Sequence, residues 1–322
     1  MPHAIRIHQT GGPEVLKYEQ VAKTDPKPGE VRLKQTAIGL NFIDTYHRSG
    51  LYPLQMPLTL GTEAAGVVEA AGRGVKTVKE GDRVAYCGLI GAYADSRVVP
   101  ADRLVKLPKW IDDQTAAAMM LKGMTAEYLI RRTYRVKKGE TVVFHAAAGG
   151  VGLIACQWLR LLGVTVIGTV GSDEKAALAK RHGCRYPVLY KTESLVEAVK
   201  KITKGKRVPV VYDSVGASTF EQSLDCLAPR GLFVSFGNAS GPVAPFNTGL
   251  LAQKGSLYFT RPTLQTYIAS REDLEKSARA LFSAVKQGVK IRVGQTFKLQ
   301  DVVKAHQALE GRKTTGSTVL IP

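Results

Sequence analysis

The 322-residue chain contains few cysteines, and they are widely separated. Cys87, Cys156, Cys184 and Cys226 include no Cys-x-x-Cys pair. This spacing provides no disulfide framework and none of the paired-cysteine motifs of structural zinc sites. We therefore expect a protein of a reducing, cytoplasmic compartment.

Long apolar runs are also missing. No stretch approaches the ~18 consecutive apolar residues that a membrane-spanning helix needs. Met1–Gln9 contains no apolar core of a signal peptide, so we expect no secretory signal. Hydrophobic residues make up 44% and charged residues 22% of the chain, as in ordinary globular proteins. The length predicts two domains.

Acidic residues are scarce relative to basic ones. Asp and Glu number 27 against 45 Lys and Arg, which gives a net charge of +18. Such an excess suits nucleic acid, an anionic surface or an acidic ligand. The densest basic stretch, Lys200–Arg207, lacks the interleaved aromatic residues on which bases stack. A solvated helix end is therefore favoured there over a nucleic-acid site.

The first 120 residues have the pattern of a β domain. Val31–Ile38 alternates apolar and polar residues, and Gly66–Ala70 and Asp82–Tyr86 are further short strands between glycine-rich turns. These features predict an antiparallel, barrel-like domain. The final strand, Ser317–Ile321, is expected to return to it, so that the domain comprises residues 1–122 and 264–322. Ser270–Gly288 within that second segment is predicted to be an amphipathic helix.

The middle of the chain, residues 123–263, alternates strands with helices. Strands are predicted at 141–145, 164–170, 186–190, 208–213, 232–236 and 257–260, and helices at 150–162, 175–182, 195–203 and 220–227. Alternation of this kind indicates an α/β domain whose parallel sheet carries helices on both faces. Six strands fit a doubly wound, dinucleotide-binding Rossmann fold.

One motif follows a predicted strand and opens a helix: His145-Ala-Ala-Ala-Gly-Gly-Val-Gly152. Aligned with G-x-G-x-x-G, it places Ala147, Gly149 and Gly152 at the three glycine positions. Because the second glycine has no side chain, a pyrophosphate can approach the backbone there. Because the third glycine has none, the helix can pack closely on the strand. The helix N-terminus then offers free N–H groups to the phosphates.

The next strand bears on the identity of the nucleotide. NAD sites usually carry an acidic residue where the second strand ends, but this strand ends Thr169-Val-Gly-Ser172. Ser172 and Lys175 suit the 2′-phosphate of NADPH, which the sequence favours. Asp173 leaves NAD open as the alternative cofactor. Its carboxylate either contacts the ribose, as in NAD sites, or is an ordinary acidic residue at the start of a helix.

Zinc chemistry is disfavoured for two reasons. No cysteine pair is present, and Gly61-Thr-Glu63 offers no histidine ligand. Cys156, on the apolar face of a predicted helix, is expected to be a small core residue. We expect His145, at the end of its strand, to be packed rather than to act as a base.

Several motifs together resemble the NADPH-dependent, zeta-crystallin-like quinone oxidoreductases of the zinc-free medium-chain dehydrogenase/reductase superfamily. The resemblance covers essentially the whole chain. It rests on Gly11-Gly-Pro-Glu-Val-Leu16, Asn41-Phe-Ile-Asp-Thr-Tyr46, Arg48-Ser-Gly-Leu-Tyr-Pro53, Gly61-Thr-Glu-Ala-Ala-Gly66, Lys122-Gly-Met-Thr-Ala126, Ala146-Ala-Ala-Gly-Gly-Val-Gly152, Tyr212-Asp-Ser-Val-Gly216 and Ser235-Phe-Gly-Asn238. It implies a GroES-like β-barrel catalytic domain beside the Rossmann domain.

The resemblance also implies site residues. Asn41, Tyr46 and Thr125 would be the catalytic residues and would also contact the cofactor. Asn41 and Tyr46 would line the nicotinamide and the substrate mouth, and Thr125 would lie near the nicotinamide. Gly149, Gly150 and Val151 would hold the pyrophosphate. The remaining implied cofactor contacts are Gly171, Ser172, Lys175 and Tyr190 at the 2′-phosphate, and Ser214, Phe236, Gly237, Phe259, Thr260, Arg261 and Arg312 along the rest of the molecule.

The residues themselves leave simpler interpretations open. Tyr46 can fill a barrel mouth, Asn41 can serve a turn, and Lys175 can be a solvated helix lysine. No acid–base pair stands out. Hydride transfer from NADPH to a quinone needs orientation more than acid catalysis. The expected proton source is water or a hydroxyl such as that of Tyr46.

Three rival functions are retained. The first is another zinc-free NADPH reductase acting on enones or enoyl thioesters. The second is single-stranded nucleic-acid binding through the basic surface. The third is a crystallin-like structural role without turnover, against which the intact cofactor motif argues. The resemblance further implies a homodimer formed at the sheet edge of the cofactor domain, at Leu257–Thr260.

Overall fold

The structure is a computed structural model that describes all residues from Met1 to Pro322. The chain forms two units. The first comprises Met1–Met124, Ile268–Arg279 and Ile291–Pro322, and the second comprises Thr125–Tyr267 and Ala280–Lys290. Two parts of the C-terminal segment that we expected in the first domain, Leu264–Tyr267 and Ala280–Lys290, thus group with the second unit. None of the helices is long and apolar enough to cross a membrane.

The first unit is built mainly from strands. They are β1 (His3–Ile7), β2 (Lys17–Gln20), β3 (Glu30–Leu40), β4 (Leu58–Thr59), β5 (Glu63–Ala71), β6 (Arg83–Cys87), β7 (Ser96–Pro100), β8 (Val105–Lys106), β15 (Val293–Lys298) and β16 (Ser317–Ile321). Helices α1 (Phe42–Ser49) and α10 (Val302–Glu310) accompany them, and α2 (Asp113–Tyr128) and α9 (Arg271–Lys286) each continue from the first unit into the second.

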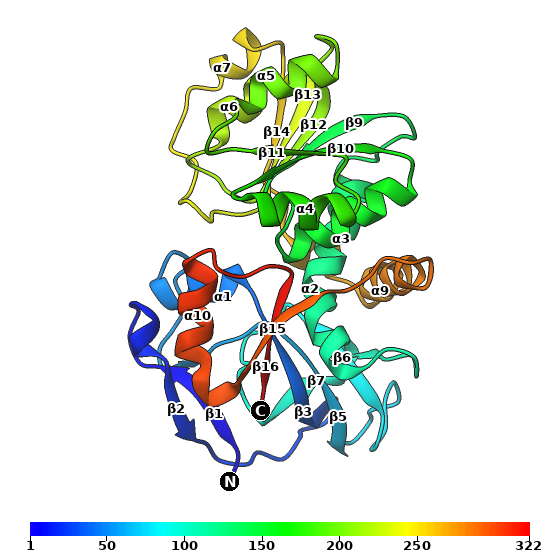
Figure 1. The fold of residues 1–322 in the computed structure, drawn as a ribbon. Coiled ribbons are helices and arrows are strands. Elements are labelled where there is room, and N and C mark those ends of the chain that lie inside the picture. Colours follow the sequence, from blue (N-terminus) through cyan, green and yellow to red (C-terminus); the bar gives the residue numbers. More distant parts are fainter. The chain divides into compact units, whose positions relative to one another are not determined.

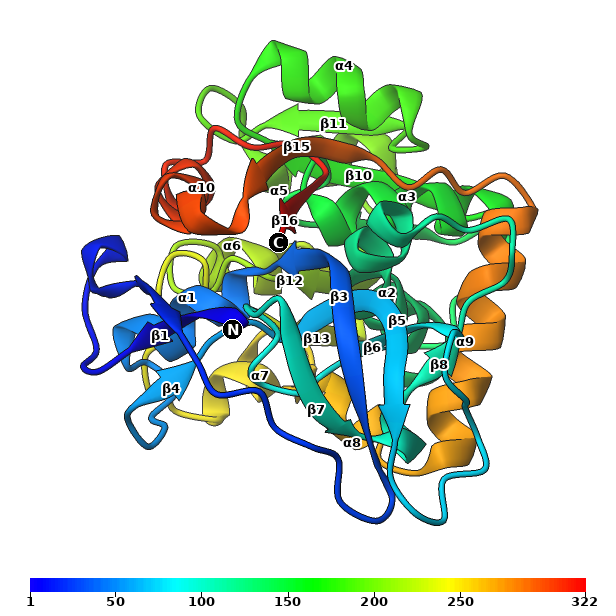
Figure 2. The ribbon, with the colours of Figure 1, turned by 90° about the horizontal axis from the view of Figure 1, so that it is seen from below.

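The long strand β3 organises the first unit. It pairs antiparallel with β5 along one side, and with β16 and β7 along the other. Figure 2 shows β3, β5, β6 and β7 lying side by side. The pairing of Thr318 with Leu40 confirms that the final strand returns to this domain. Buried apolar residues from these strands, including Leu33, Ile38 and Leu320, form its core.

The second unit is a six-stranded parallel sheet. Its strands are β9 (Thr141–Phe144), β10 (Thr165–Val170), β11 (Tyr186–Leu189), β12 (Val208–Asp213), β13 (Leu227–Ser235) and β14 (Tyr258–Thr260), in the order β11-β10-β9-β12-β13-β14. The helices are α3 (Gly150–Leu161), α4 (Asp173–Arg181), α5 (Leu195–Ile202), α6 (Phe220–Asp225), α7 (Gly249–Gln253) and α8 (Leu264–Tyr267). This confirms the predicted doubly wound sheet.

The sheet reverses its strand order beside β9. From β9 the chain winds through β10 to β11 in one direction, and from β12 through β13 to β14 in the other. Helices α3 and α4 cover one face of the sheet, and α5 and α6 the other (Figure 1). Ligands of such sheets bind where the strands on either side of the reversal end. A ligand is therefore expected at the turns that follow β9 and β12.

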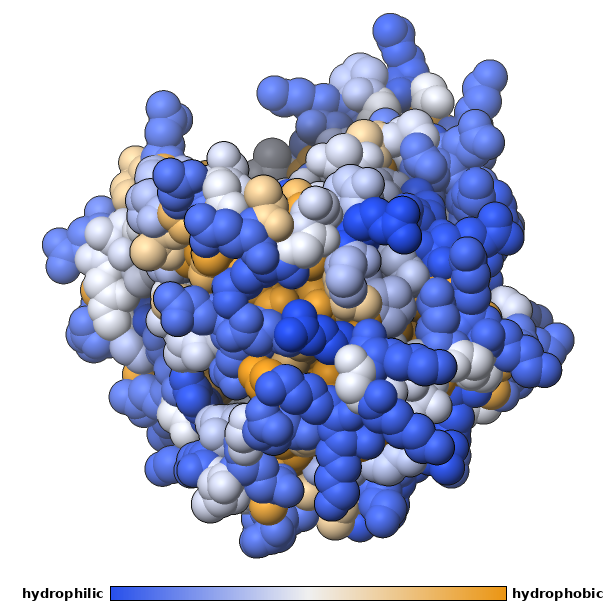
Figure 3. Space-filling view, turned by 90° about the horizontal axis from the view of Figure 1, so that it is seen from above, coloured by the Kyte–Doolittle hydropathy of each residue, from blue (hydrophilic) through white to orange (hydrophobic).

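Hydrophilic residues predominate on the face shown in Figure 3. In the face shown in Figure 3, apolar residues appear as separate orange areas among hydrophilic side chains. The basic stretch at the end of α5 is solvated: Lys200 is exposed and forms an ion pair with Glu197, 2.8 Å away. This is the helix-end arrangement favoured by the sequence.

Candidate active site

The glycine-rich turn connects β9 to α3, as predicted. Gly149 is the N-cap of α3, and its N–H donates to the Ala146 carbonyl at 2.9 Å. Gly149, Gly150 and Val151 are partly exposed, whereas Ala147 and Ala148 are buried. The first N–H groups of a twelve-residue helix therefore lie at an accessible turn, which is the usual geometry of a phosphate site.

The two glycines of this turn differ in their surroundings. A Cβ added to Gly152 would lie 2.8 Å from Ala147 Cα, so the helix could not pack as it does. A Cβ added to Gly149 would meet only the Ala146 carbonyl, at 3.2 Å. Packing thus requires Gly152, while the bare backbone at Gly149 leaves space for a ligand.

The residues predicted around a 2′-phosphate gather at the end of β10. A Cβ on Gly171 would lie 2.8 Å from the Tyr190 hydroxyl, so this glycine lets the ring lie across the strand end. Ser172 is the N-cap of α4 and accepts the Lys175 N–H at 3.4 Å. Asp173 is exposed at the first position of α4. This is the position of an ordinary helix-start acid.

Further predicted residues follow β12, β13 and β14. Gly237 packs on Ser214, because a Cβ there would lie 2.6 Å from the Ser214 carbonyl oxygen. Phe236 contacts Phe144, with ring centroids 5.8 Å apart, and Arg261 donates to the Ser235 carbonyl at 2.9 Å. Phe259 instead packs in an aromatic cluster with Phe220, Phe233 and Phe246. Thr260 is half-buried beside it, and Thr125 is buried in α2.

In the first unit, Asn41 is held from two sides. It is the N-cap of α1, and its backbone N–H donates to the Asp44 carboxylate at 2.8 Å. Its side-chain amide donates to Glu63 Oε2 at 3.0 Å and to the Gly39 carbonyl at 3.2 Å. The turn role considered for Asn41 is therefore present. The same contacts fix the orientation of its amide.

Tyr46 lies one turn further along α1. Its side chain is buried and meets Tyr52 edge-on, with ring centroids 5.3 Å apart. The neighbouring His47 is also buried, and its Nδ1 has no hydrogen-bond partner. Burial lowers the pKa of His47. Arg312, after α10, is exposed and has a left-handed backbone with a φ of 56°.

Two buried carboxylates beside Asn41 were not among the predicted site residues. Glu63 is fully buried and accepts the Leu121 N–H at 2.7 Å and the Lys122 ammonium at 3.1 Å. Asp44 accepts the Thr62 hydroxyl at 3.0 Å and the Tyr93 hydroxyl at 2.9 Å. Both carboxylates lie inside motifs quoted above. Their partners are distant in sequence, so no local pattern could indicate the network.

The Asp44 network continues across the unit. The Tyr93 hydroxyl lies 3.1 Å from His306 Nε2, and Arg48 contacts His306 Nδ1 at 2.9 Å. Arg48 also binds the Glu310 carboxylate through two hydrogen bonds, of 2.7 and 2.9 Å. Because the Arg48 guanidinium donates to Nδ1, neutral His306 carries its proton on Nε2 and donates to Tyr93. Helix α10 is thereby tied to α1.

Burial shifts the pKa values of this network. Removal from water raises the pKa of Asp44 to about 7, although bonds from Asn41, Tyr93 and Thr62 and the Lys122 charge favour its carboxylate. Burial, assisted by the Arg48 charge, lowers the pKa of His306 to about 3. His306 is thus neutral near pH 7, as its hydrogen bonds require.

The structure contains no group of three or more histidine, cysteine, aspartate or glutamate side chains placed to hold a metal ion. All four cysteines are buried and free. Burial raises the pKa of the Cys226 thiol to about 12, so this side chain is not a ready thiolate. Cys156 is a core residue of α3, as expected from the sequence.

Known proteins share this architecture along its full length. A curated quinone oxidoreductase of Pseudomonas aeruginosa is 54% identical over 325 residues, and the alignment covers all of both chains. The chain belongs to the quinone oxidoreductase family. It is a zinc-free member of the medium-chain dehydrogenase/reductase superfamily, as the sequence motifs predicted.

Two family profiles match successive parts of the chain. Residues 27–109 match the profile "Alcohol dehydrogenase GroES-like domain", and residues 150–283 match "Zinc-binding dehydrogenase". The crystal structure of Escherichia coli quinone oxidoreductase complexed with NADPH is 52% identical, with a TM-score of 0.98, and the match covers 99% of this chain and 100% of that one. A 2-haloacrylate reductase of a Burkholderia species is 47% identical over 331 residues, covering 100% of this chain and 99% of its own.

Proposed function

We propose that this protein transfers a hydride from NADPH to quinones without a metal. The observation that carries the proposal is the similarity, over the whole chain, to a quinone oxidoreductase crystallised with NADPH. More than half of the aligned residues are also identical in a curated quinone oxidoreductase whose whole chain the alignment covers. The predicted enzyme class and cofactor follow from these two relationships.

The glycine-rich turn fits the pyrophosphate of this cofactor. Its exposed helix N-terminus supplies N–H groups and a partial positive charge, and no side chain at Gly149 fills the space before it. We assign Gly149, Gly150 and Val151 to the pyrophosphate. Gly171, Ser172, Lys175 and Tyr190 would hold the 2′-phosphate, where the Lys175 ammonium would supply the positive charge that NADPH requires and NADH does not.

The other contacts to the cofactor remain proposals carried by the family resemblance. In the second unit they are Thr125, Ser214, Phe236, Gly237, Phe259, Thr260 and Arg261. Arg312 is the one further proposed contact that lies in the first unit. For Gly237 and Phe259, the packing described above is by itself enough to explain why a glycine and a phenylalanine occupy these positions.

Asn41 and Tyr46 are the proposed residues of the substrate side. When bound, NADPH supplies the hydride. The chain must then orient the quinone and allow a proton to reach the reduced oxygen. The Asn41 side-chain amide suits orientation because it is fixed: its N–H groups donate to the buried Glu63 carboxylate and to the Gly39 carbonyl. The Tyr46 hydroxyl is the proposed proton donor, with water as the alternative.

A second candidate function is reduction of an activated carbon–carbon double bond. It is favoured by the 47% identity to a 2-haloacrylate reductase, whose substrate is an electron-poor alkene. Quinones and such alkenes are both hydride acceptors, so one cofactor site serves either reaction. Quinone reduction predicts the higher kcat/KM with a quinone, and alkene reduction predicts it with an electron-poor alkene.

Assembly and location complete the proposal. We propose a homodimer formed through β14, the edge strand of the parallel sheet, where Tyr258 is 62% exposed. An edge strand presents unpaired backbone groups that a second copy can cover. A cytoplasmic location is proposed from the absence of paired cysteines and the four free thiols. Nucleic-acid binding has no support from the solvated Lys200–Arg207 stretch.

The decisive experiment measures NADPH and NADH oxidation with a panel of quinones, 2-enones and 2-haloacrylate. We expect the highest kcat/KM with NADPH and a quinone. A higher value with an alkene would support the second candidate, and no turnover with any acceptor would overturn both. In Lys175→Met, the KM for NADPH should rise at least tenfold while that for NADH changes little. An equal loss for both cofactors would remove Lys175 from the 2′-phosphate site.

A further inference from the structure

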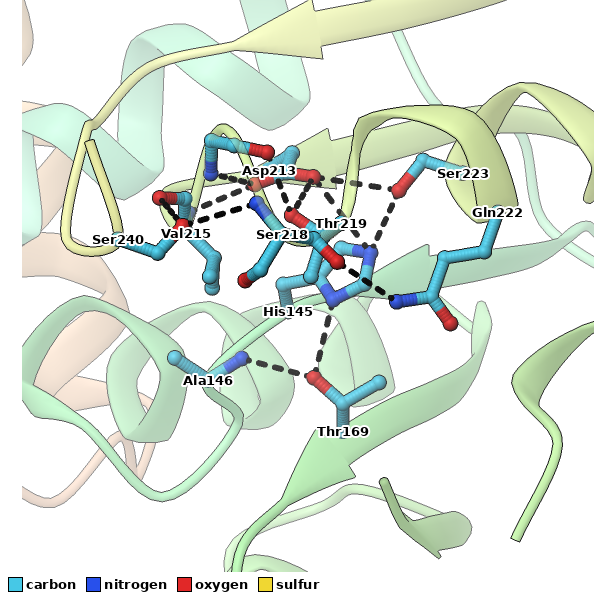
Figure 4. Close-up of polar contacts among 11 residues, drawn as sticks. His145, Ala146, Thr169, Asp213, Val215, Ser218, Thr219, Gln222, Ser223 and Ser240 are labelled. Carbon is cyan, nitrogen blue, oxygen red and sulfur yellow. Dashed lines mark hydrogen bonds and ion pairs between the residues drawn. The ribbon is translucent and has the colours of Figure 1, made fainter. Parts of the chain in front are cut away.

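A network of buried polar side chains lies directly beneath the glycine-rich turn (Figure 4). His145 follows β9, Thr169 is near the end of β10, Asp213 ends β12, and Ser223 lies on α6. Their side chains are almost completely inaccessible: His145 is 1% exposed, and Asp213 and Ser223 are 0% exposed. None of these four residues was predicted to act in the site.

The hydrogen bonds of this network run in one direction. Ser223 donates its single proton to Asp213 Oδ2 at 3.2 Å, so its oxygen accepts from His145 Nε2, 2.9 Å away. Burial lowers the pKa of His145 against the opposing charge of Asp213, and the ring is neutral near pH 7. With its proton on Nε2, His145 accepts the Thr169 hydroxyl at Nδ1, at 3.1 Å.

Thr169 in turn holds two successive N–H groups of the turn. Its Oγ1 accepts the Ala146 N–H at 3.2 Å, and its backbone carbonyl accepts the Ala147 N–H at 3.0 Å. Ala146 has a φ of 54°, in the left-handed region that residues other than glycine seldom adopt. The Thr169 hydroxyl thus supports the backbone where the turn is strained, three residues before Gly149.

Asp213 anchors the opposite end of the network and shapes a second loop. Its Oδ1 accepts the Val215 N–H at 2.7 Å and the Gly216 N–H at 3.0 Å, and its Oδ2 accepts the Thr219 hydroxyl at 2.6 Å. The loops after β9 and β12, which flank the reversal of strand order, therefore share one set of hydrogen bonds. Movement of one loop would break bonds that hold the other.

The serine, histidine and aspartate do not form a hydrolytic triad. In a triad the imidazole accepts the serine proton, whereas here the serine donates to Asp213 and the imidazole donates to the serine. Burial also keeps any substrate from Ser223. The arrangement can hold the backbone but cannot activate a nucleophile.

We propose that Thr169, oriented by His145 and through Ser223 by Asp213, is a positioning residue for NADPH. Its hydroxyl holds Ala146 in the left-handed conformation and thereby sets the turn that receives the pyrophosphate. This inference rests on the proposed function, since it assigns the turn to NADPH. It makes cofactor affinity, rather than acceptor affinity, depend on a side chain that need not touch the cofactor.

The test compares Thr169→Val with Thr169→Ser. Valine keeps the shape of the side chain but removes the hydroxyl, while serine keeps the hydroxyl. NADPH affinity is measured by fluorescence titration of the full chain without acceptor, and kcat and KM by steady-state kinetics. We expect Thr169→Val to raise the Kd and KM for NADPH at least tenfold, with a much smaller change in the quinone KM. Thr169→Ser should restore the Kd to within threefold of the wild-type value.

Thr203→Val is the matched control. The Thr203 hydroxyl also bonds the backbone of the second unit, donating to the Val199 carbonyl at 2.7 Å and accepting the Arg207 N–H at 2.9 Å, but at the end of α5. Its loss should leave the NADPH Kd unchanged. If Thr169→Val fails to fold, Ser223→Ala decides the question, because it removes the hydroxyl that joins His145 Nε2 to Asp213 Oδ2 and leaves only their direct contact of 3.7 Å. Its Kd should rise at least threefold.

The outcomes separate the inference from the proposed function. A wild-type Kd in a folded Thr169→Val variant overturns the inference, and so does an equal loss in Thr169→Ser or in Thr203→Val. An unchanged Kd in Ser223→Ala, where that variant decides, also overturns it. Failure of the wild-type protein itself to bind NADPH would overturn the proposed function, whatever the variants do.

Discussion

The Lys122 ammonium and the Glu63 carboxylate form an ion pair of 3.1 Å in the interior of the first unit. The Glu63 side chain is fully buried and that of Lys122 is 8% exposed. The same carboxylate also accepts the amide of Asn41, the proposed substrate-side residue. A buried charge pair thus orients a candidate site residue, although neither charge was singled out in the sequence.

We expect Lys122→Met to lower the free energy of unfolding by about 3–5 kcal/mol, because it leaves Glu63 as an unpaired buried charge. Urea denaturation of the purified variant measures this loss. The double variant Lys122→Met/Glu63→Gln, which removes both charges, should regain part of it. The recovery is incomplete because glutamine keeps only one of the two oxygens that accept from Leu121 and Asn41. A single variant as stable as the wild-type protein would show that the pair is not held as described.

Asp44 should make stability depend on pH. Its pKa is about 7 in the folded chain, against ~3.9 for an exposed aspartate. Between about pH 4 and pH 7 the folded state retains a proton that the unfolded state has released, so this contribution to stability falls as the pH rises. In Asp44→Asn that contribution disappears, and the free energy of unfolding should increase more steeply with pH across this window.

The comparison is the slope of unfolding free energy against pH in wild type, Asp44→Asn and Asp25→Asn. Asp25 is the control, because its side chain is 94% exposed. The charged or titratable groups that contact or influence Asp44 are Tyr93 and Lys122, with His306 and Arg48 beyond. His306 also titrates in the unfolded chain, but that contribution is common to all three proteins. Equal slopes in wild type and Asp44→Asn would contradict the prediction.

The two glycines of the cofactor turn should respond differently to a methyl group. Gly152→Ala forces a Cβ to 2.8 Å from the Ala147 backbone and should destabilise the second unit by about 1–3 kcal/mol. Gly149→Ala, with a φ of −80° and one contact at 3.2 Å, should keep its thermal midpoint but raise the NADPH Kd at least tenfold. Thermal melts and NADPH titrations of both variants measure the two effects. A lower thermal midpoint in Gly149→Ala together with an unchanged midpoint in Gly152→Ala would contradict the prediction.

Tyr46→Phe tests the proposed proton donor. Positioned general acids typically contribute about 100-fold or more to a rate, so loss of the hydroxyl should lower kcat with quinones by at least that order. The NADPH Kd should change little, since only the hydroxyl is removed. Tyr18→Phe, at an exposed ring on β2, is the matched control. Unaltered kcat and KM in Tyr46→Phe would exclude Tyr46 from the mechanism and leave water as the donor.

The elements of both units could be predicted because each is encoded locally. Strand alternation located β3, β5 and β6, and the change to helical periodicity located α3 directly after the glycine-rich turn. The doubly wound parallel sheet of the second unit was also predicted, since alternating strands and helices require crossover connections of one hand. Its strand order came from the structure. The return of β16 to the first unit was also expected, and its pairing with β3 confirms it.

The roles of individual charged residues could not be predicted in this way. Arg48 binds Glu310 and His306, and Tyr93 lies between Asp44 and His306, through contacts that join the two ends of the chain. Side chains so far apart in sequence leave no periodic pattern. The same holds for Thr169, which looked like an ordinary strand residue until its hydroxyl was seen beneath Ala146.

The sequence by itself therefore determined the two-domain α/β architecture, the family and the glycine turn that suits NADPH, because these depend on short motifs and local periodicity. Only the tertiary structure decided which side chains hold that turn and the Asn41 amide in place. Burial removes water as a partner, so every buried charge and hydroxyl must find another one in the fold. Those partners, Lys122 for Glu63 and His145 for Thr169, come from whichever element the fold brings alongside.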